Sequence, residues 1–291
     1  MNDSKNIRAQ VLKEALPYFQ RYRGQPVVVK YGGHAMSSRD LKESFAGDMV
    51  LLEQARVNPV VVHGGGPQIG EMLAALGIES RFHDGMRITD ETTMDVVEMV
   101  LAGSINKEIV ARVARHGGRA VGLTGRDGGL LRAHKLAAQP SVKTPELIDL
   151  GRVGEVEAVD PTILRTLIHD EFIPVIAPVA YGPGGIPLNI NADVVAERIS
   201  TQLQAKRLLL MTDVDGVRDE AGELQPELSA AQAESMIQKG IISGGMIPKV
   251  RCAVRAARGG VEKVTILNGT IPNAVILELF TNEGVGTVIT A

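Results

Sequence analysis

Two runs of three valines, each soon followed by glycines, constrain the fold of this chain more than any other feature. Val27–Val29 lies just before Gly32-Gly33, and Val60–Val62 lies just before Gly64–Gly66. Such uninterrupted β-branched runs are typical of strands that are buried on both faces of a parallel sheet. Between them, apolar residues recur at helical spacing over residues 41–52. The first 76 residues therefore predict a β-α-β-α unit with right-handed crossovers, and hence an α/β fold.

The rest of the chain continues this alternation, and one central sheet is expected to run through both halves. Residues 128–160 are different, because their short, glycine-punctuated alternation predicts β-hairpins. A soft boundary is expected near residues 180–187. Helices are expected at 91–115, 161–169, 192–204, 229–239 and 248–258, and strands at 120–124, 172–179, 207–211 and 263–267.

The N-terminal 22 residues predict a separate amphipathic arm. Apolar side chains recur near helical spacing over residues 3–22, and Pro17 is expected to kink or interrupt that helix. An arm that precedes the core more often mediates assembly than chemistry.

Composition excludes several classes of protein. A formal net charge of −3 gives no basic field for nucleic acid and no attraction to anionic membranes, and 3% aromatic residues make base stacking an unlikely role. The single cysteine, Cys252, cannot form a disulfide framework or a cysteine-based metal site. The N-terminus lacks the apolar core of a signal peptide, and no apolar run reaches membrane-spanning length. These features predict a cytoplasmic protein.

A lysine and two glycines follow the first valine strand, where open α/β sheets bind ligands. Lys30 would supply a cation there, and Gly32-Gly33 would let a phosphate approach the backbone closely. Alternatively, Lys30 marks only the point where a buried strand meets water.

A second anion site is indicated by His63-Gly64-Gly65-Gly66-Pro67, between the second strand and a helix expected to begin near Pro67. Backbone N–H groups at a helix N-terminus bind phosphate or carboxylate, whereas a tight turn would need only one glycine. His63 itself is interpreted as structural. The sequence has no P-loop and no Gly-x-Gly-x-x-Gly at a strand–helix turn, which argues against a P-loop enzyme and a dehydrogenase.

Two cations outside these loops are candidates for binding anions. Lys249 would lie near the positive end of a helix, which is unfavourable unless an anion compensates. Arg87 could hold a carboxylate through two parallel hydrogen bonds, although a surface arginine near a helix start is equally common.

Short polar side chains gather at residues 189–193. Asn189 and Asn191 would share one side of an extended stretch, and Asp193 would either serve a site or only cap the next helix. The segment Thr212–Val217, after a buried strand, would line a nucleotide or turn the chain.

Together these motifs resemble the amino-acid kinase family, in family order and from residue 26 onward. The resemblance implies a three-layer αβα sandwich around a largely parallel sheet. In detail, the chain is similar to the family members that act on N-acetyl-L-glutamate. The matching motifs are Lys30 with Gly32-Gly33, His63-Gly-Gly-Gly66, Arg87, Asn189-x-Asn-Ala-Asp193, Thr212-Asp-Val-Asp-Gly216 and Gly244-Gly-Met-x-x-Lys249.

The resemblance implies ATP-dependent phosphorylation of the side-chain carboxylate of N-acetyl-L-glutamate, giving N-acetyl-L-glutamyl 5-phosphate and ADP, the second step of the acetylated route to L-arginine. An ionised carboxylate needs no general base, so positioning and charge neutralisation would carry the reaction. Mg²⁺ would arrive with ATP, and no protein metal site is expected. The alternatives are another acceptor within the family (glutamate, aspartate or carbamate) and a non-catalytic arginine sensor.

Each motif residue receives a role from the resemblance. Lys30 and Lys249 would stabilise the transferred phosphoryl group, with Asp193 holding both ammonium groups. The implied substrate contacts are Gly65, Gly66, Arg87 and Asn189, and the implied ATP contacts are Gly32, Gly33, Thr212, Asp213, Gly216, Gly244 and Gly245.

Both ends of the chain resemble the arginine-sensitive, hexameric branch of the family. This implies an oligomerisation arm at 1–22, a lobe for the amino-acid substrate at 23–182 and an ATP lobe at 183–291. It also implies a homohexamer built as a trimer of dimers, and a regulatory protein partner is a further expectation. L-arginine as the inhibitor would contact Tyr18, Glu278 and Gly284.

Overall fold

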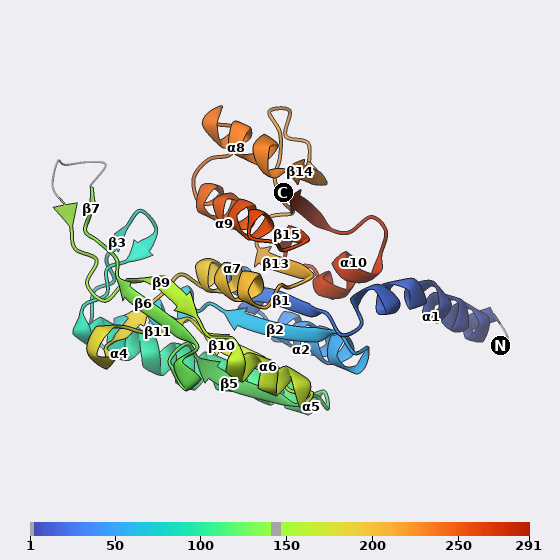
Figure 1. Ribbon diagram of the computed structural model, residues 1–291, viewed down its shortest axis with the longest axis horizontal. Helices are drawn as coiled ribbons and strands as arrows, with labels where there is room; N and C mark the ends of the chain where they lie inside the picture. Colours follow the sequence, from blue (N-terminus) through green and yellow to red (C-terminus); the bar gives the residue numbers. More distant parts are fainter. Residues whose placement is uncertain (1–2, 141–146) are drawn as a thin grey trace.

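An eight-stranded sheet forms the centre of the computed structural model, which describes residues 3–140 and 147–291 (Figure 1). The strand order is β14-β16-β15-β13-β1-β2-β10-β5, and all neighbours are parallel except β15 and β16. The two valine runs form the central strands β1 and β2, so the predicted α/β fold is confirmed. The strands are β1 (Pro26–Tyr31), β2 (Asn58–His63), β5 (Ala120–Thr124), β10 (Ile173–Ala177), β13 (Arg207–Thr212), β14 (Glu227–Ser229), β15 (Lys263–Asn268) and β16 (Gly286–Thr290).

Helices cover both faces of this sheet, and alternation along β1 divides the core between them. Val27 and Val29 pack in a cluster with residues of α2 and α10, whereas Val28 packs with residues of α7 and α9. The helices are α1 (Asp3–Tyr22), α2 (Arg39–Gln54), α3 (Gly66–Ala75), α4 (Glu91–Glu98), α5 (Asn106–Arg115), α6 (Thr162–His169), α7 (Ala192–Gln202), α8 (Ala230–Gln238), α9 (Met246–Arg258) and α10 (Ala274–Phe280).

The prediction of a single helix over residues 91–115 was wrong for the middle of this range. A π-helix, η2 (Met99–Ile105), separates α4 from α5, and the Asn106 N–H donates to the carbonyl of Leu101, five residues earlier. The wider turn holds one more residue than an α-helical turn. It directs Leu101 and Ile105 toward Gly65 and buries Asn106 to 1% exposure.

The interruption that was one of the two outcomes expected at Pro17 does not occur, because α1 continues from Asp3 to Tyr22 with Pro17 inside it; the kink stays a prediction. Pro17 is exposed, so water can satisfy the carbonyl that its ring leaves without a donor. Figure 1 shows α1 extending away from the body of the molecule, with α10 beside its C-terminal end.

The hairpin prediction for residues 128–160 is confirmed outside the undescribed residues 141–146. β6 (Leu131–Lys135) pairs antiparallel with β9 (Gly154–Val159), and β7 (Gln139–Pro140) pairs with β8 (Leu147–Ile148). Beside β6, β11 (Val179–Tyr181) continues into β12 (Pro187–Asn189), which completes a second sheet of order β12-β11-β6-β9. The expected lobe boundary at 182/183 falls between these last two strands and stays a prediction. A further short hairpin is formed by β3 (Phe82–His83) and β4 (Met86–Arg87).

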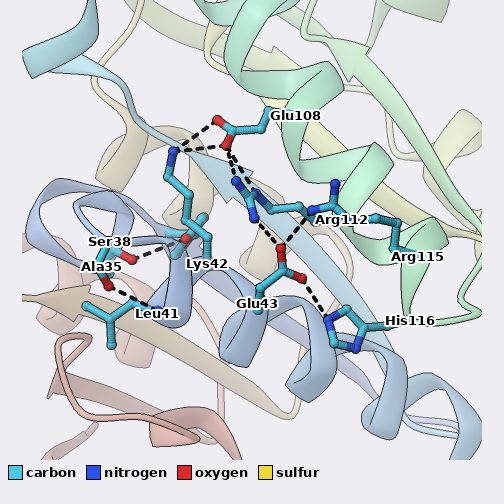
Figure 2. Close-up of polar contacts among 10 residues, drawn as sticks. Ala35, Ser38, Leu41, Lys42, Glu43, Glu108, Arg112, Arg115 and His116 are labelled. Carbon is cyan, nitrogen blue, oxygen red and sulfur yellow. Dashed lines mark hydrogen bonds and ion pairs between the residues drawn. The ribbon is translucent and has the colours of Figure 1, made fainter.

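A polar network joins α2 to α5 on one face of the sheet (Figure 2). Lys42 Nζ lies 2.9 Å from Glu108 Oε1, and Arg112 Nη2 lies 2.6 Å from the same oxygen. Glu43 pairs with Arg112 and lies 3.0 Å from the Nε2 of His116. The network therefore holds α5, which begins at Asn106, against α2.

Among the helices of the described ranges, none is long and apolar enough to cross a bilayer. The cytoplasmic location stays a prediction.

Candidate active site

Three charged side chains from three elements meet beyond the carboxyl end of β1. Lys30 follows Val28 by two residues, so it points to the sheet face that α7 and α9 cover. Asp193 lies in the first turn of α7, with its Oδ1 3.1 Å from Lys30 Nζ and its Oδ2 2.8 Å from Lys249 Nζ. A single carboxylate thus separates two ammonium groups that come from distant parts of the sequence.

Burial and charge act against each other in this cluster. Burial alone would raise the pKa of the Asp193 carboxyl, but Lys30 and Lys249 together hold that pKa down at about 2. Burial lowers the pKa of the Lys30 ammonium group, the charge of Lys249 lowers it further, and Asp193 opposes both. With two cations and one anion, the cluster keeps a net positive charge for an anionic ligand.

Asn191 caps α7, so the alternative in which Asp193 only caps this helix does not hold. Its Oδ1 accepts from the Asp193 N–H at 2.8 Å and from the Val194 N–H at 3.4 Å. Asn189 donates to Thr89 Oγ1 at 3.3 Å, and both asparagines line one cavity, as expected for side chains on the same side of the segment. Capping by Asn191 leaves the carboxylate of Asp193 available to both lysines.

The two glycine segments lie against each other. Gly64 N donates to Tyr31 O at 2.8 Å, and a Cβ built on Gly32 would lie 3.4 Å from the Gly64 backbone and 3.5 Å from Lys30 Nζ. A Cβ on Gly65 would clash with Ile105 Cδ1 and lie 2.7 Å from Leu101 Cδ2, so a side chain there would require the ends of these two π-helix side chains to move. Gly66 then begins α3, as expected for an anion site at a helix N-terminus.

Arg87 is held by its own surroundings at the opposite side of the site. Its Nη1 donates to Ser80 Oγ at 2.5 Å, its Nη2 donates to Gly66 O at 2.9 Å, and its guanidinium stacks over the Phe82 ring at 4.6 Å. Burial lowers the pKa of Arg87. Fixed in this way, the guanidinium has N–H groups left to bind an anion.

A cavity of about 700 Å³ connects these groups. It is lined by the predicted residues Lys30, Gly33, Gly65, Gly66, Arg87, Asn189 and Asp193. Lys249 contacts Asp193 from behind the lining. The predicted ATP residues Gly244 and Gly245 are exposed just before α9. Thr212 is the last residue of β13, Asp213 follows it, and Gly216 packs against Thr287.

Sequence reasoning missed the far wall of this cavity, which includes Glu197, Arg198 and Arg255. Glu197 is one helical turn after Asp193 and accepts from Arg255 Nε at 2.9 Å. The i, i+4 spacing from Asp193 was the available signal, whereas the contribution of Arg255 depends on the packing of α9 against α7.

The three residues expected to bind arginine gather around α10. Glu278 is buried and pairs with Arg207, while its Oε1 accepts from Thr265 Oγ1 at 2.9 Å. A Cβ on Gly284 would lie 2.7 Å from Glu278 Oε2. Tyr18 Oη donates to Asn282 Oδ1 at 2.5 Å, which ties α1 to the segment after α10. The Glu278 carboxylate therefore already binds one guanidinium of this chain.

Within residues 3–140 and 147–291, no group of three or more His, Cys, Asp or Glu side chains is arranged to hold a metal ion. Both oxygens of Asp193 are engaged by lysines.

Comparisons with known proteins agree with this geometry. A sequence profile of the Amino acid kinase family matches residues 25–268. Acetylglutamate kinase from Stutzerimonas stutzeri (strain A1501) is 53% identical over 285 residues, which are 97% of this chain and 95% of that relative.

Two solved structures are also similar, both of N-acetylglutamate synthase from Neisseria gonorrhoeae. The complex with coenzyme A and N-acetyl-glutamate has a TM-score of 0.84 and 27% identity, and the complex with coenzyme A and L-arginine has a TM-score of 0.81 and 26% identity. Each covers 97% of this chain, which spans 63% and 65% of the length of those chains. The profile match and the 53% identical relative establish that this chain belongs to the amino acid kinase family.

Proposed function

We propose that this chain transfers the γ-phosphoryl group of ATP to the side-chain carboxylate of N-acetyl-L-glutamate, forming N-acetyl-L-glutamyl 5-phosphate and ADP. This is the second step of the acetylated route of L-arginine biosynthesis. The relative that is 53% identical is named acetylglutamate kinase. The observation that carries the proposal is the Lys30–Asp193–Lys249 cluster beside a cavity with glycine N–H groups and a fixed arginine.

The cluster suits phosphoryl transfer between two anions. The substrate carboxylate is ionised at neutral pH, so it attacks the γ-phosphorus directly and ADP leaves with the bridging oxygen. Lys30 and Lys249 supply positive charge where negative charge develops, and Asp193 keeps the two cations close together despite their repulsion. Such preorganised charges need no rearrangement during the reaction.

The other side of the cavity suits the amino-acid substrate. Arg87 would bind the α-carboxylate, Asn189 the acetamido group, and the N–H groups of Gly65 and Gly66 the reacting carboxylate. Gly32, Gly33, Thr212, Asp213, Gly216, Gly244 and Gly245 are proposed to contact ATP.

Magnesium is proposed to enter bound to the phosphates of ATP, where it would neutralise charge. This fits the donor set of the site, because Asp193 serves the lysines and phosphate oxygens would supply the remaining ligands.

We further propose that L-arginine inhibits the enzyme through a site at Tyr18, Glu278 and Gly284. The similar synthase whose structure holds L-arginine supports this. Because Glu278 already pairs with Arg207, a bound arginine would have to share the Glu278 carboxylate with that guanidinium or displace it.

The N-terminal arm, with apolar residues on its surface, is proposed to join dimers into a hexamer. A regulatory protein partner also stays a proposal.

The deciding experiment measures ADP release from Mg²⁺-ATP with N-acetyl-L-glutamate or L-glutamate, each with and without L-arginine. Turnover only with the acetylated acceptor is expected.

Lys30→Ala and Lys249→Ala should each lower kcat by about 10²–10³-fold, because each removes one preorganised charge. Lys239→Ala, at an exposed position, is the matched control.

Other outcomes would point elsewhere. Turnover with L-glutamate, aspartate or carbamate would keep the family chemistry and replace the acceptor. Arginine binding with no turnover would favour the non-catalytic sensor. Wild-type turnover by Lys30→Ala would contradict the role of the cluster.

A further inference from the structure

His63 is a buried polar group that the proposed mechanism leaves without a role. It is the last residue of β2, its side chain is 0% exposed, and it directly precedes the glycine loop. Its Nδ1 lies 2.9 Å from Gly64 O, and its Nε2 lies 3.2 Å from Asn106 Nδ2. Both ring nitrogens are thus engaged, one of them with the glycine loop.

The surroundings of Asn106 fix which ring nitrogen of His63 carries the proton. Asn106 Nδ2 also lies 2.9 Å from Val175 O and 3.3 Å from Leu123 O, while Lys107 Nζ donates to its Oδ1 at 3.2 Å. A flipped amide would set Oδ1 against two carbonyl oxygens, so Nδ2 must face them and His63. His63 Nε2 therefore accepts, and its Nδ1–H donates to Gly64 O.

The charge state of His63 agrees with this assignment. Burial lowers the pKa of the imidazole to about 4, against a smaller opposing effect of the Gly64 carbonyl. The ring is therefore neutral near pH 7 and keeps one donor and one acceptor.

The direction of one peptide follows from this hydrogen bond. In a trans peptide, the C=O and the following N–H point in opposite directions. Because His63 holds the Gly64 carbonyl toward the core, the Gly65 N–H is directed away from the ring, toward the cavity that both glycines line. Two consecutive glycines rotate freely, so the sequence of the loop alone would not hold this peptide in one orientation.

The π-helix contributes to the same arrangement. Leu101 and Ile105 fill the space beneath Gly65, and Asn106 follows them directly as the first residue of α5. One helical segment thus supplies both the apolar support of the loop and the amide that sets the tautomer of His63.

We propose that His63 and Asn106 are positioning residues that orient the Gly64–Gly65 peptide, so that the Gly65 N–H points at the reacting carboxylate and phosphoryl group. This inference rests on the proposed kinase function.

Kinetics of three variants test the proposal. His63→Leu removes both hydrogen bonds and should lower kcat by about 10–100-fold, less than the full loss of a preorganised donor, with little change in KM for ATP. His63→Asn places an amide N–H near the position of Nδ1 and should recover much of that loss. His134→Leu, at an exposed histidine of β6, is the control and should behave like wild type.

Two kinetic results would overturn the proposal. One is a folded His63→Leu with wild-type kcat. The other is an equal fall in His63→Leu and His63→Asn together with raised KM for both substrates, which would indicate general distortion of the site.

Nitrogen-15 NMR of the histidine rings of the wild-type protein provides a readout that needs neither turnover nor a stable variant. A proton on Nδ1 of His63 is expected, with the resonance assigned by its loss in His63→Asn or, if that variant does not fold, by through-bond correlation. A proton on Nε2 would overturn the proposal. Absent turnover in wild type with an Nδ1 proton present would contradict the proposed function and leave the assigned hydrogen bond intact.

Discussion

A carboxylate between two buried ammonium groups governs how the candidate site responds to pH and to substitution. The pKa of Asp193, about 2, lies below the value of about 3.9 for an unfolded aspartate. The stabilisation from this carboxylate is therefore fully present above about pH 4 and is lost as pH falls through about 2. At neutral pH the charge of Asp193 does not titrate, so a change of activity with pH in this range must come from other groups.

Asp193→Asn should change both the turnover and its dependence on pH. Without the carboxylate, the two lysines repel each other unopposed, and kcat should fall by about 10²–10³-fold. Asp193 raises the pKa of Lys30 against burial, so its loss should move the alkaline limb of the kcat–pH profile to lower pH. The profile measured from neutral to alkaline pH checks this, with Asp170→Asn as the exposed control. An unmoved alkaline limb would show that Lys30 does not set it.

Gly65 is required for space rather than for an unusual φ, because its φ of 170° is extended backbone. Gly65→Ala should therefore lower kcat, since its Cβ would clash with Ile105 Cδ1 and lie 2.7 Å from Leu101 Cδ2, so that these side chains would have to shift. Adding Ile105→Val removes the nearer atom and should restore part of the loss. Steady-state kinetics of the two single variants and the double variant measure this coupling. If the effects of the two single substitutions on kcat simply add in the double variant, the proposed clash between residues 65 and 105 is contradicted.

At the scale of elements, the sequence predicted the strands well because their cause is local. The valine runs alone identify β1 and β2, and the alternation from Val28 to Lys30 sets the face of the sheet on which Lys30 lies. The π-helix could not be predicted, because it depends on how Leu101 and Ile105 pack beneath Gly65. The role of Asn191 was missed for a different reason: Asn and Asp both cap helices, and only the positions of Lys30 and Lys249 decide between Asn191 and Asp193.

Contact between α2 and α10 likewise joins segments far apart in the sequence. Asp48 of α2 accepts from the N–H groups of Val275 and Ile276 at the start of α10, and Ser44 Oγ accepts from Asn273 N at 2.8 Å. Burial raises the pKa of the Asp48 carboxyl to about 7 in spite of these donors.

This raised pKa predicts a pH-dependent effect of Asp48→Asn on stability. Between about pH 4 and about pH 7 the unfolded chain releases a proton that the folded chain keeps, so Asp48 makes the protein less stable as pH rises. The amide of the variant does not titrate, so the variant should gain stability relative to wild type over this range. Urea unfolding at about pH 5 and about pH 8 measures the difference. Asp40→Asn, at an exposed position of α2, should show no such trend; an equal trend in both variants would contradict the role of Asp48.

At the scale of the whole molecule, the central sheet connects the candidate site to the segments expected to regulate it. Arg207 begins β13 and pairs with Glu278, and its Nη1 donates to Tyr22 Oη at 3.0 Å at the end of α1. β13 lies beside β1, with Leu210 opposite Lys30. The arm is therefore connected, through Tyr22 and Arg207, to the strand next to the one that carries Lys30.

The arm itself presents an apolar surface that its own chain leaves uncovered: Ile7, Val11, Leu12 and Leu16 are 51–67% exposed. If this surface joins dimers into a hexamer, Leu12→Glu should yield dimers, because a charge cannot be buried there without a partner. Arginine-free turnover should persist, whereas inhibition by arginine should weaken, since the proposed arginine site includes Tyr18 of the arm. Analytical ultracentrifugation and inhibition curves test both effects against Gln20→Glu, which adds the same charge at an exposed position of α1. A wild-type sedimentation coefficient of Leu12→Glu would show that α1 does not hold the hexamer together. Dimers with unchanged inhibition would show that arginine inhibits without the hexamer.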